Sequence, residues 1–122
     1  MKIDTDNFKI AGTAKIDKND NGIAISYDDG TLICANSVRT TGQNAEAWGT
    51  VFMSTLEMTY PKKFIELPIV VPQICVSSNV FWAGLGSYGA QSVSKTTIRA
   101  ISCTNYANHD ITYGYVAIGR WK

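Results

Sequence analysis

Histidine and cysteine are scarce in this chain, and their scarcity limits the catalytic and metal centres that it can form. One histidine and three cysteines occur among 122 residues. Cys34, Cys75 and Cys103 include no CxxC pair, so a Cys/His zinc site would need ligands from widely separated segments. Each cysteine instead lies within an apolar run, which predicts buried free thiols and synthesis in a reducing compartment.

Acidic side chains are also few where a catalytic centre would need them. Six of the ten Asp and Glu residues lie within the first 30 positions, leaving Glu46, Glu57, Glu66 and Asp110 for the rest. The sequence has no GxSxG, HExxH or phosphate-loop motif, and no clustered carboxylate pair of the kind that a glycosidase uses. We therefore predict a protein that is not an enzyme and uses no cofactor.

Charge and long apolar runs are limited as well. Charged residues make up 17% of the chain, the net charge is +1, and the basic residues are scattered, which predicts no nucleic-acid partner. No apolar run approaches the roughly 20 residues of a membrane helix, and the first residues lack the apolar core of a signal peptide. With 45% hydrophobic residues, the sequence predicts one globular domain without membrane insertion.

What the sequence does contain is a series of short segments typical of β-strands. Stretches rich in Val, Ile, Thr, Tyr and Phe recur between Gly, Asn, Asp, Ser and Pro, while helical periodicity is nearly absent. The pattern predicts an all-β fold, an antiparallel β-sandwich. Its expected strands cover residues 8–10, 13–16, 23–27, 31–38, 47–60, 69–77, 80–84, 96–104 and 112–121.

Turn residues and prolines indicate how some of these strands are arranged. Asp28-Asp-Gly30 supplies hairpin chemistry, because glycine readily takes positive φ, so strands 23–27 and 31–38 should pair. Pro61, Pro68 and Pro72 gather around strand 69–77. Proline is tolerated at the edges and bulges of sheets, so this strand should be bent or lie at an edge.

The two ends of the chain differ in apolar content. Residues 1–21 hold few large apolar side chains, which predicts an N-terminal arm that becomes ordered by pairing with other strands or chains, before a sandwich domain over residues 22–122. The segment 112–121 is instead aromatic and β-branched, which predicts an inner strand. Because side chains alternate along a strand, one face should carry Val116 and Ile118, and the other Tyr113, Tyr115 and Ala117.

One acidic segment fits part of a calcium-loop template. Asp17, Asn19, Asn21 and Asp28 occupy positions 1, 3, 5 and 12, with Gly22 at the sharp turn. Both flanks are typical of strands, however, and Asn-Gly is also a common hairpin signal. A plain turn and a calcium site both remain open.

Two loops carry side chains suited to a polar ligand. Trp82 and Tyr88 lie among three glycines, and because adjacent strand residues face opposite sides, one of Phe81 and Trp82 should pack in the core while the other faces outward. In the second loop, hydroxyl-bonding groups and an aromatic ring suit a sugar. These are Tyr106, Asn108, His109 and Asp110. An ordinary hairpin loop is the alternative, and a third is a metal held by three copies of His109 on an oligomer axis.

Four motifs follow one another along residues 22–122. An Asp-Gly hairpin leads into an Ile-Cys strand (Tyr27-Asp-Asp-Gly-Thr-Leu-Ile-Cys34), and a Trp-Gly strand follows (Trp48-Gly-Thr-Val-Phe52). Tyr60-Pro-Lys-Lys-Phe64 with Pro68 comes next, and the last is Tyr115-Val-Ala-Ile-Gly-Arg-Trp121. In this order they resemble the C-terminal domain of bacteriophage and prophage tail-fibre proteins.

The resemblance implies a small sandwich similar to the H-type lectin fold, associated as a homotrimer at the tip of a virion tail fibre that is assembled in the bacterial cytoplasm. Such tips bind glycans or other receptors on the host cell surface, so the expected function is non-enzymatic recognition of a saccharide. A trimerisation or capping domain without its own ligand is the alternative, followed by a polysaccharide-cleaving tailspike fragment. The motifs transfer no binding residue, so the ligand residues above rest on loop chemistry.

Overall fold

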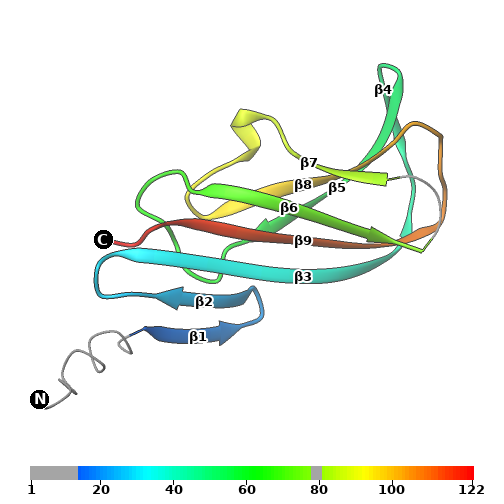
Figure 1. Ribbon diagram of the computed structural model, residues 1–122. Coiled ribbons are helices and arrows are strands. Elements are labelled where there is room, and N and C mark those ends of the chain that lie inside the picture. The colour runs from blue at the N-terminus through cyan, green and yellow to red at the C-terminus, as the bar shows by residue number, and fades with distance from the viewer. Residues whose placement is uncertain (1–13, 78–80) are drawn as a thin grey trace, which may run out of the picture.

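The computed structural model describes residues 14–77 and 81–122, which form two antiparallel sheets packed face to face (Figure 1). The five-stranded sheet has the order β1-β2-β3-β9-β6, and the four-stranded sheet has the order β4-β5-β8-β7. The first sheet contains β1 (Lys15–Asn19), β2 (Gly22–Ser26), β3 (Thr31–Gln43), β9 (His109–Arg120) and β6 (Ile69–Val76). The second contains β4 (Glu46–Trp48), β5 (Val51–Thr59), β8 (Lys95–Ser102) and β7 (Phe81–Leu85), with the short 3₁₀ helix η1 (Tyr88–Ala90). The all-β antiparallel sandwich is thus confirmed.

The core lies between the sheets because alternate residues of each strand point inward. Leu32 and Cys34 on β3, Tyr113 on β9 and Ile98 on β8 are fully buried. Phe64, from the loop between β5 and β6, is buried with them and meets the ring of Tyr60 edge to face at 5.0 Å between centroids. No described helix has the length or hydropathy needed to cross a membrane.

The segment 112–121 forms most of an inner strand, as predicted. β9 lies between β3 and β6, and Tyr113, Tyr115 and Ala117 are buried while Val116 and Ile118 are exposed on the opposite face. Strand β6, which contains Pro72, lies at the edge of the five-stranded sheet. Both the face assignment and the edge placement are confirmed.

The predicted hairpin between residues 23–27 and 31–38 is the β2–β3 pair. Gly30 closes the turn with φ of 99°, and its N–H donates to the Tyr27 carbonyl at 3.0 Å. The Thr31 N–H donates to Asp29 Oδ1 at 2.9 Å. This backbone bond lowers the pKa of the Asp29 carboxyl, because it stabilises the ionised form.

Some predicted strand limits were wrong. The single strand expected over residues 47–60 is a hairpin of β4 and β5, because Gly49, with φ of 63°, turns the chain after Trp48. Strand β1 lies within the predicted arm 1–21 and pairs with β2. The predicted strand 8–10 lies outside the described residues, as does part of the strand 13–16.

Only one of the three cysteines is buried as predicted. Cys34 lies in the core, whereas Cys75 and Cys103 are exposed, because Cys75 is on the outer face of β6 and Cys103 follows the end of β8. Burial raises the pKa of the Cys34 thiol to about 11, and its Sγ lies 3.6 Å from the Lys62 carbonyl oxygen. The thiolate, which is the reactive form, is therefore rare at this position at neutral pH.

Thiol labelling should separate these positions. In the native protein at pH 8, a maleimide should modify Cys75 and Cys103 within minutes and leave Cys34 unmodified, because that thiol is buried and protonated. Mass spectrometry of the labelled peptides measures this, and labelling in urea provides the control in which all three react. Modification of Cys34 at the rate of the other two would contradict the packing of β3.

A hydroxyl network joins the two sheets inside the core. Ser54 Oγ on β5 lies 2.6 Å from the Tyr106 hydroxyl and 2.8 Å from the Tyr113 hydroxyl on β9. The Tyr106 hydroxyl donates to the Ala100 carbonyl at 3.0 Å, and the Tyr113 hydroxyl donates to Gln43 Oε1 at 3.1 Å. Burial raises the pKa of both tyrosines, so the hydroxyls stay protonated as donors.

Replacing Ser54 with Ala should lower the free energy of unfolding by about 1–3 kcal/mol, because two buried tyrosine hydroxyls lose a partner. Urea denaturation followed by tryptophan fluorescence measures the change. The neighbouring substitution Thr55→Ala is the control, since Thr55 is exposed and should change the free energy by less than about 0.5 kcal/mol. Equal effects of the two substitutions would show that the network contributes little.

Candidate functional site

The outer face of the four-stranded sheet combines aromatic, apolar and polar side chains. Its register pairs Trp82 with Ile101, Ile101 with Met53, and Met53 with Glu46. Directly paired residues project from the same face of a sheet, so these side chains form one transverse row. Trp82 is 43% exposed at one end, and Glu46 is exposed at the other. We call this surface, together with Arg99, Thr55 and Trp48, the outer-face site.

Arg99 lies in the next row of the same face. It pairs with Thr55 on one side and with Gly84 on the other. Its guanidinium carbon lies 5.0 Å from the centre of the Trp48 ring, which is the geometry of a cation–π contact. Trp48 is 55% exposed, so the indole covers the guanidinium and still presents surface to solvent.

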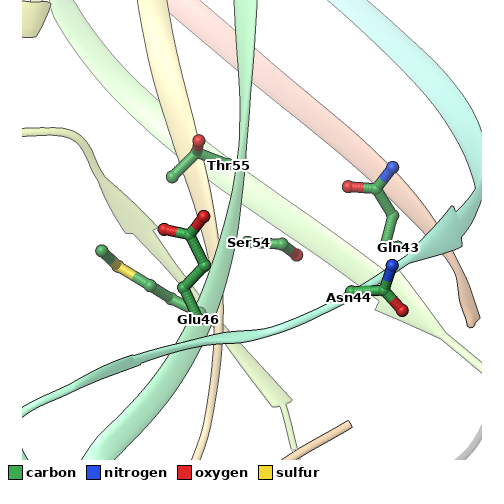
Figure 2. A pocket seen from close by; sticks show the side chains of 6 residues that line it. Gln43, Asn44, Glu46, Ser54 and Thr55 are labelled. Carbon is green, nitrogen blue, oxygen red and sulfur yellow. The ribbon is translucent and has the colours of Figure 1, made fainter. Parts of the chain in front are cut away.

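A small polar pocket adjoins this face where the chain passes from β3 to β4. It has a volume of about 210 Å³ and is lined by Gln43, Asn44, Glu46, Met53, Ser54 and Thr55. Figure 2 shows Glu46 and Thr55 on one side of the view, Gln43 and Asn44 on the other, and Ser54 between them. Three of the lining side chains already form hydrogen bonds within the protein. Asn44 Oδ1 accepts the Asn108 N–H at 3.0 Å, and Gln43 and Ser54 belong to the hydroxyl network described above. The side chains of Glu46 and Thr55 make no hydrogen bond with any residue that the structure describes, so they are open to a ligand.

Phe81 and Trp82 face opposite sides of β7, as predicted. Phe81 packs against the core and contacts the Tyr106 ring at 4.7 Å between centroids. Trp82 faces outward. The outward residue is therefore Trp82, and it belongs to the outer-face site.

Tyr106 was nominated as a ligand residue, but its side chain is part of the core. It is only 4% exposed, and its hydroxyl is bonded to Ser54 and to the Ala100 carbonyl. Its own carbonyl accepts the Ala45 N–H at 2.9 Å. The aromatic ring in this loop thus anchors the chain, and sequence alone did not distinguish an anchoring tyrosine from an exposed one.

The other residues of that loop lie near the surface, but each is engaged in structure. Asn108 takes φ of 55° and lies before β9, whereas His109 and Asp110, which were expected in the loop, begin the strand. His109 Nδ1 lies 3.0 Å from the Ala107 carbonyl oxygen, and its ring packs against Phe81 and Tyr106. Asp110 forms an ion pair with Arg39 at 3.1 Å.

The six nominated ligand residues do not share one site. The rings of Tyr106 and His109 contact Phe81, which lies on the inner side of β7, whereas Trp82 lies on the outer side. Tyr88 is 84% exposed on η1, which follows the opposite end of β7. Trp82 and Tyr88 therefore remain candidates for ligand contact, separate from the loop before β9.

The four residues of the calcium hypothesis are also separated. Asn19 and Asn21 lie in the β1–β2 turn, where Asn19 Oδ1 accepts the Asn21 N–H at 2.8 Å. Asp17 pairs with Ala24 in the hairpin, and Asp28 follows the far end of β2. The described structure does not bring the four together.

Chelation tests the calcium hypothesis directly. If the melting temperature of the protein is unchanged after a chelator is added, calcium has no stabilising role.

Sequence reasoning did not nominate Trp48, Arg99, Glu46, Thr55 or the pocket residues as ligand contacts. Trp48 was assigned to a strand motif, and the hairpin at Gly49 that brings its ring to Arg99 was not expected. The one available signal was the alternation in Lys95–Ser102, which places Arg99 on an outward face.

Comparison with known proteins gives likenesses in structure alone. No protein-family model and no curated protein matches the chain. An N-truncated R1-type pyocin tail fibre has 14% sequence identity and a TM-score of 0.62, with 98% of each chain covered. A fibre of the P. aeruginosa R1 pyocin, comprising its C-terminal residues 323–701, has 14% identity and a TM-score of 0.64 over 98% of this chain and 32% of that one. The chain thus shares the fold of pyocin tail-fibre chains over nearly its whole length.

Proposed function

We propose that this chain is the receptor-binding tip domain of a phage or prophage tail fibre, that it acts without catalysis, and that it recognises a saccharide on the host cell surface. The observation that carries the proposal is the likeness in fold to pyocin tail-fibre chains over 98% of the chain. The place of action is the virion tail fibre, assembled in the bacterial cytoplasm. A reduced, buried Cys34 is compatible with that compartment.

The outer-face site supports the saccharide part of the proposal. Exposed indole rings pack against the C–H faces of sugars, and nearby hydroxyl and carboxylate groups bond to sugar hydroxyls. Trp82 and Trp48 supply the rings, and Thr55 and Glu46 supply the polar groups. This combination of aromatic and polar groups is the kind of surface that suits a saccharide.

A glycan array probed with the whole protein tests this proposal. We expect a defined set of host envelope saccharides to bind, and we expect Trp82→Ala to reduce binding about tenfold or more, because a buried aromatic contact often dominates an interface. Lys63→Ala, an exposed residue in the loop between β5 and β6, is the control and should bind like the parent. A blank array with a folded protein would overturn the saccharide proposal.

The homotrimer is the second part of the proposal, and the outer face of the five-stranded sheet supports it. The register aligns one isoleucine from every strand of this sheet in a single transverse row. In spatial order these are Ile16, Ile25, Ile33, Ile118 and Ile69. Ile16 and Ile69 are 60% and 73% exposed, and Val116 and Val71 extend the apolar surface in the adjacent row. A contiguous apolar surface of this kind marks a protein interface, and we assign it to the other copies of the chain.

The isoleucine row also favours an alternative function, a trimerisation or capping domain without a ligand of its own. A folded trimer with a blank array would support that alternative. A polysaccharide-cleaving fragment is a further candidate, and the release of reducing ends from host polysaccharide would reveal it. Of its candidate carboxylates, Glu57 and Asp110 are in ion pairs with Lys95 and Arg39.

A further inference from the structure

Arg99 occupies the middle of the outer-face site and has no acidic partner among residues 14–77 and 81–122. Strand β8 is flanked by β5 and β7, so Arg99 lies between two neighbouring strands on a sheet face. On the same strand, Lys95 forms an ion pair with Glu57 at 3.2 Å, whereas Arg99 forms none with the described residues. Its Nε is buried and has no hydrogen-bond acceptor in the described part of the chain. A buried donor without an acceptor costs free energy, so an acceptor supplied by a ligand would be favoured here.

Trp48 fixes how this guanidinium is presented. The indole ring lies 5.0 Å from the guanidinium carbon, and no other described side chain forms a hydrogen bond or ion pair with the Arg99 side chain. A guanidinium held against an aromatic ring keeps its planar fork of N–H donors for a carboxylate or phosphate, which accepts two parallel hydrogen bonds. Because Trp48 is half exposed, it can also contact the sugar that carries the anion.

The neighbours of Arg99 divide the surface into a part that suits an anion and a part that suits hydroxyl groups. Thr55 is its direct partner across β5 and β8, and Glu46 lies beyond Thr55 at the polar pocket. A ligand anion would be repelled by the Glu46 carboxylate, which therefore suits sugar hydroxyls. The Arg99 guanidinium attracts the charged group, so one sugar can meet both requirements.

We propose, resting on the saccharide-binding function above, that Arg99 and Trp48 form a subsite for an acidic sugar. Arg99 binds the anion through its guanidinium fork, Trp48 holds the guanidinium in plane, and Thr55 and Glu46 bond to neighbouring hydroxyls. The shared chemistry is an oxyanion on a sugar, and the anion is either a carboxylate or a phosphate.

Isothermal titration of the whole protein tests the subsite with three probes: an oligogalacturonate, the same oligosaccharide with its carboxyl groups reduced to alcohols, and glucose 6-phosphate. We expect an acidic probe to bind about tenfold or more tightly than the reduced one, because hydrogen bonds to charged groups are strong. Added salt should weaken the acidic complex. Tighter binding of oligogalacturonate would identify the bound anion as a carboxylate, and tighter binding of glucose 6-phosphate would identify it as a phosphate.

Variants assign the preference to Arg99. Arg99→Gln should remove it, and Arg99→Lys should restore only part of it, because an ammonium keeps the charge and loses the fork. Lys95→Gln, on the same strand and face, is the matched control and should bind as the parent does. Circular dichroism confirms that each variant is folded.

The outcomes separate this inference from the proposed function. Binding of the carboxyl-reduced probe as tight as that of both acidic probes, or an unchanged affinity of Arg99→Gln for the acidic probes, would overturn the acidic subsite. If neutral saccharides still bind through Trp82, the saccharide function stands without it. If no saccharide of either kind binds, both fail.

Discussion

A chain that ends at Val116 should fail to fold. Removing residues 117–122 deletes the last part of β9, which lies between β3 and β6 in the five-stranded sheet. Ala117 is buried, and its loss and that of Ile118 leave Cys34 and Ile33 on β3 without their partners on β9. The edge strand β6 loses its pairing at Ile69 and Val70 as well.

The deleted residues also close the end of the sandwich. Trp121 Nε1 donates to the Tyr27 carbonyl at 2.8 Å, and the Trp121 N–H donates to the Gly30 carbonyl at 2.9 Å. The Arg120 guanidinium donates to the Asp29 carbonyl at 2.7 Å, and the Arg120 carbonyl accepts the Ile65 N–H. Because domains are stable by only roughly 5–15 kcal/mol, we expect the loss of these contacts together to unfold the chain.

Far-UV circular dichroism and the yield of soluble protein measure this result. A variant that lacks only Lys122, which is exposed, is the control and should fold normally. A soluble truncated chain with the β-sheet spectrum and cooperative melting of the parent would show that the end of β9 is dispensable.

The substitution Ile118→Asp should convert the proposed trimer into a monomer without unfolding it. Ile118 lies in the isoleucine row on the inner strand β9 and is 44% exposed in the single chain, so an isolated domain can hydrate the new carboxylate. In a trimer that buries this row, the same carboxylate would be desolvated without a partner, at a cost of several kcal/mol in each subunit.

Light scattering gives the mass of the assembly, and circular dichroism reports the fold. Thr112→Asp is the matched control, since it adds the same charge to the same strand, about 20 Å along it, opposite Arg39 and Cys75. We expect this variant to keep the mass of three chains. A trimeric Ile118→Asp protein, or a monomeric parent, would show that the isoleucine row is not the subunit interface.

The arrangement of the strands was predictable wherever local chemistry decides it. Asp29 and Gly30 specify the β2–β3 turn, alternation in the segment from Tyr113 to Ile118 assigns its two faces, and Pro72 indicates an edge. These signals act between residues that are adjacent in sequence or one strand apart. They hold regardless of which strands pack on the opposite sheet.

The candidate site was less predictable because it depends on contacts between distant segments. Tyr106 was nominated as a ligand residue and Trp48 was not, yet the fold buries the first and exposes the second. Trp48 reaches Arg99 across 51 positions of sequence, through a hairpin that Gly49 allows. The buried positions expected for Cys75 and Cys103 failed for a related reason, since an apolar run does not say which of its alternate residues faces inward.

The position of β9 between β3 and β6 limits the order in which the domain can fold. This strand follows every other described strand in sequence, yet β3 and β6 are joined only through it. Until β9 has been synthesised, the strand edges of β3 and β6 that pair with it therefore remain unpaired. Non-local pairing of this kind makes folding slow and exposes the chain to aggregation. The five-stranded sheet, and with it the isoleucine row, is completed only after synthesis of β9, so the proposed subunit interface cannot form before that strand has been made.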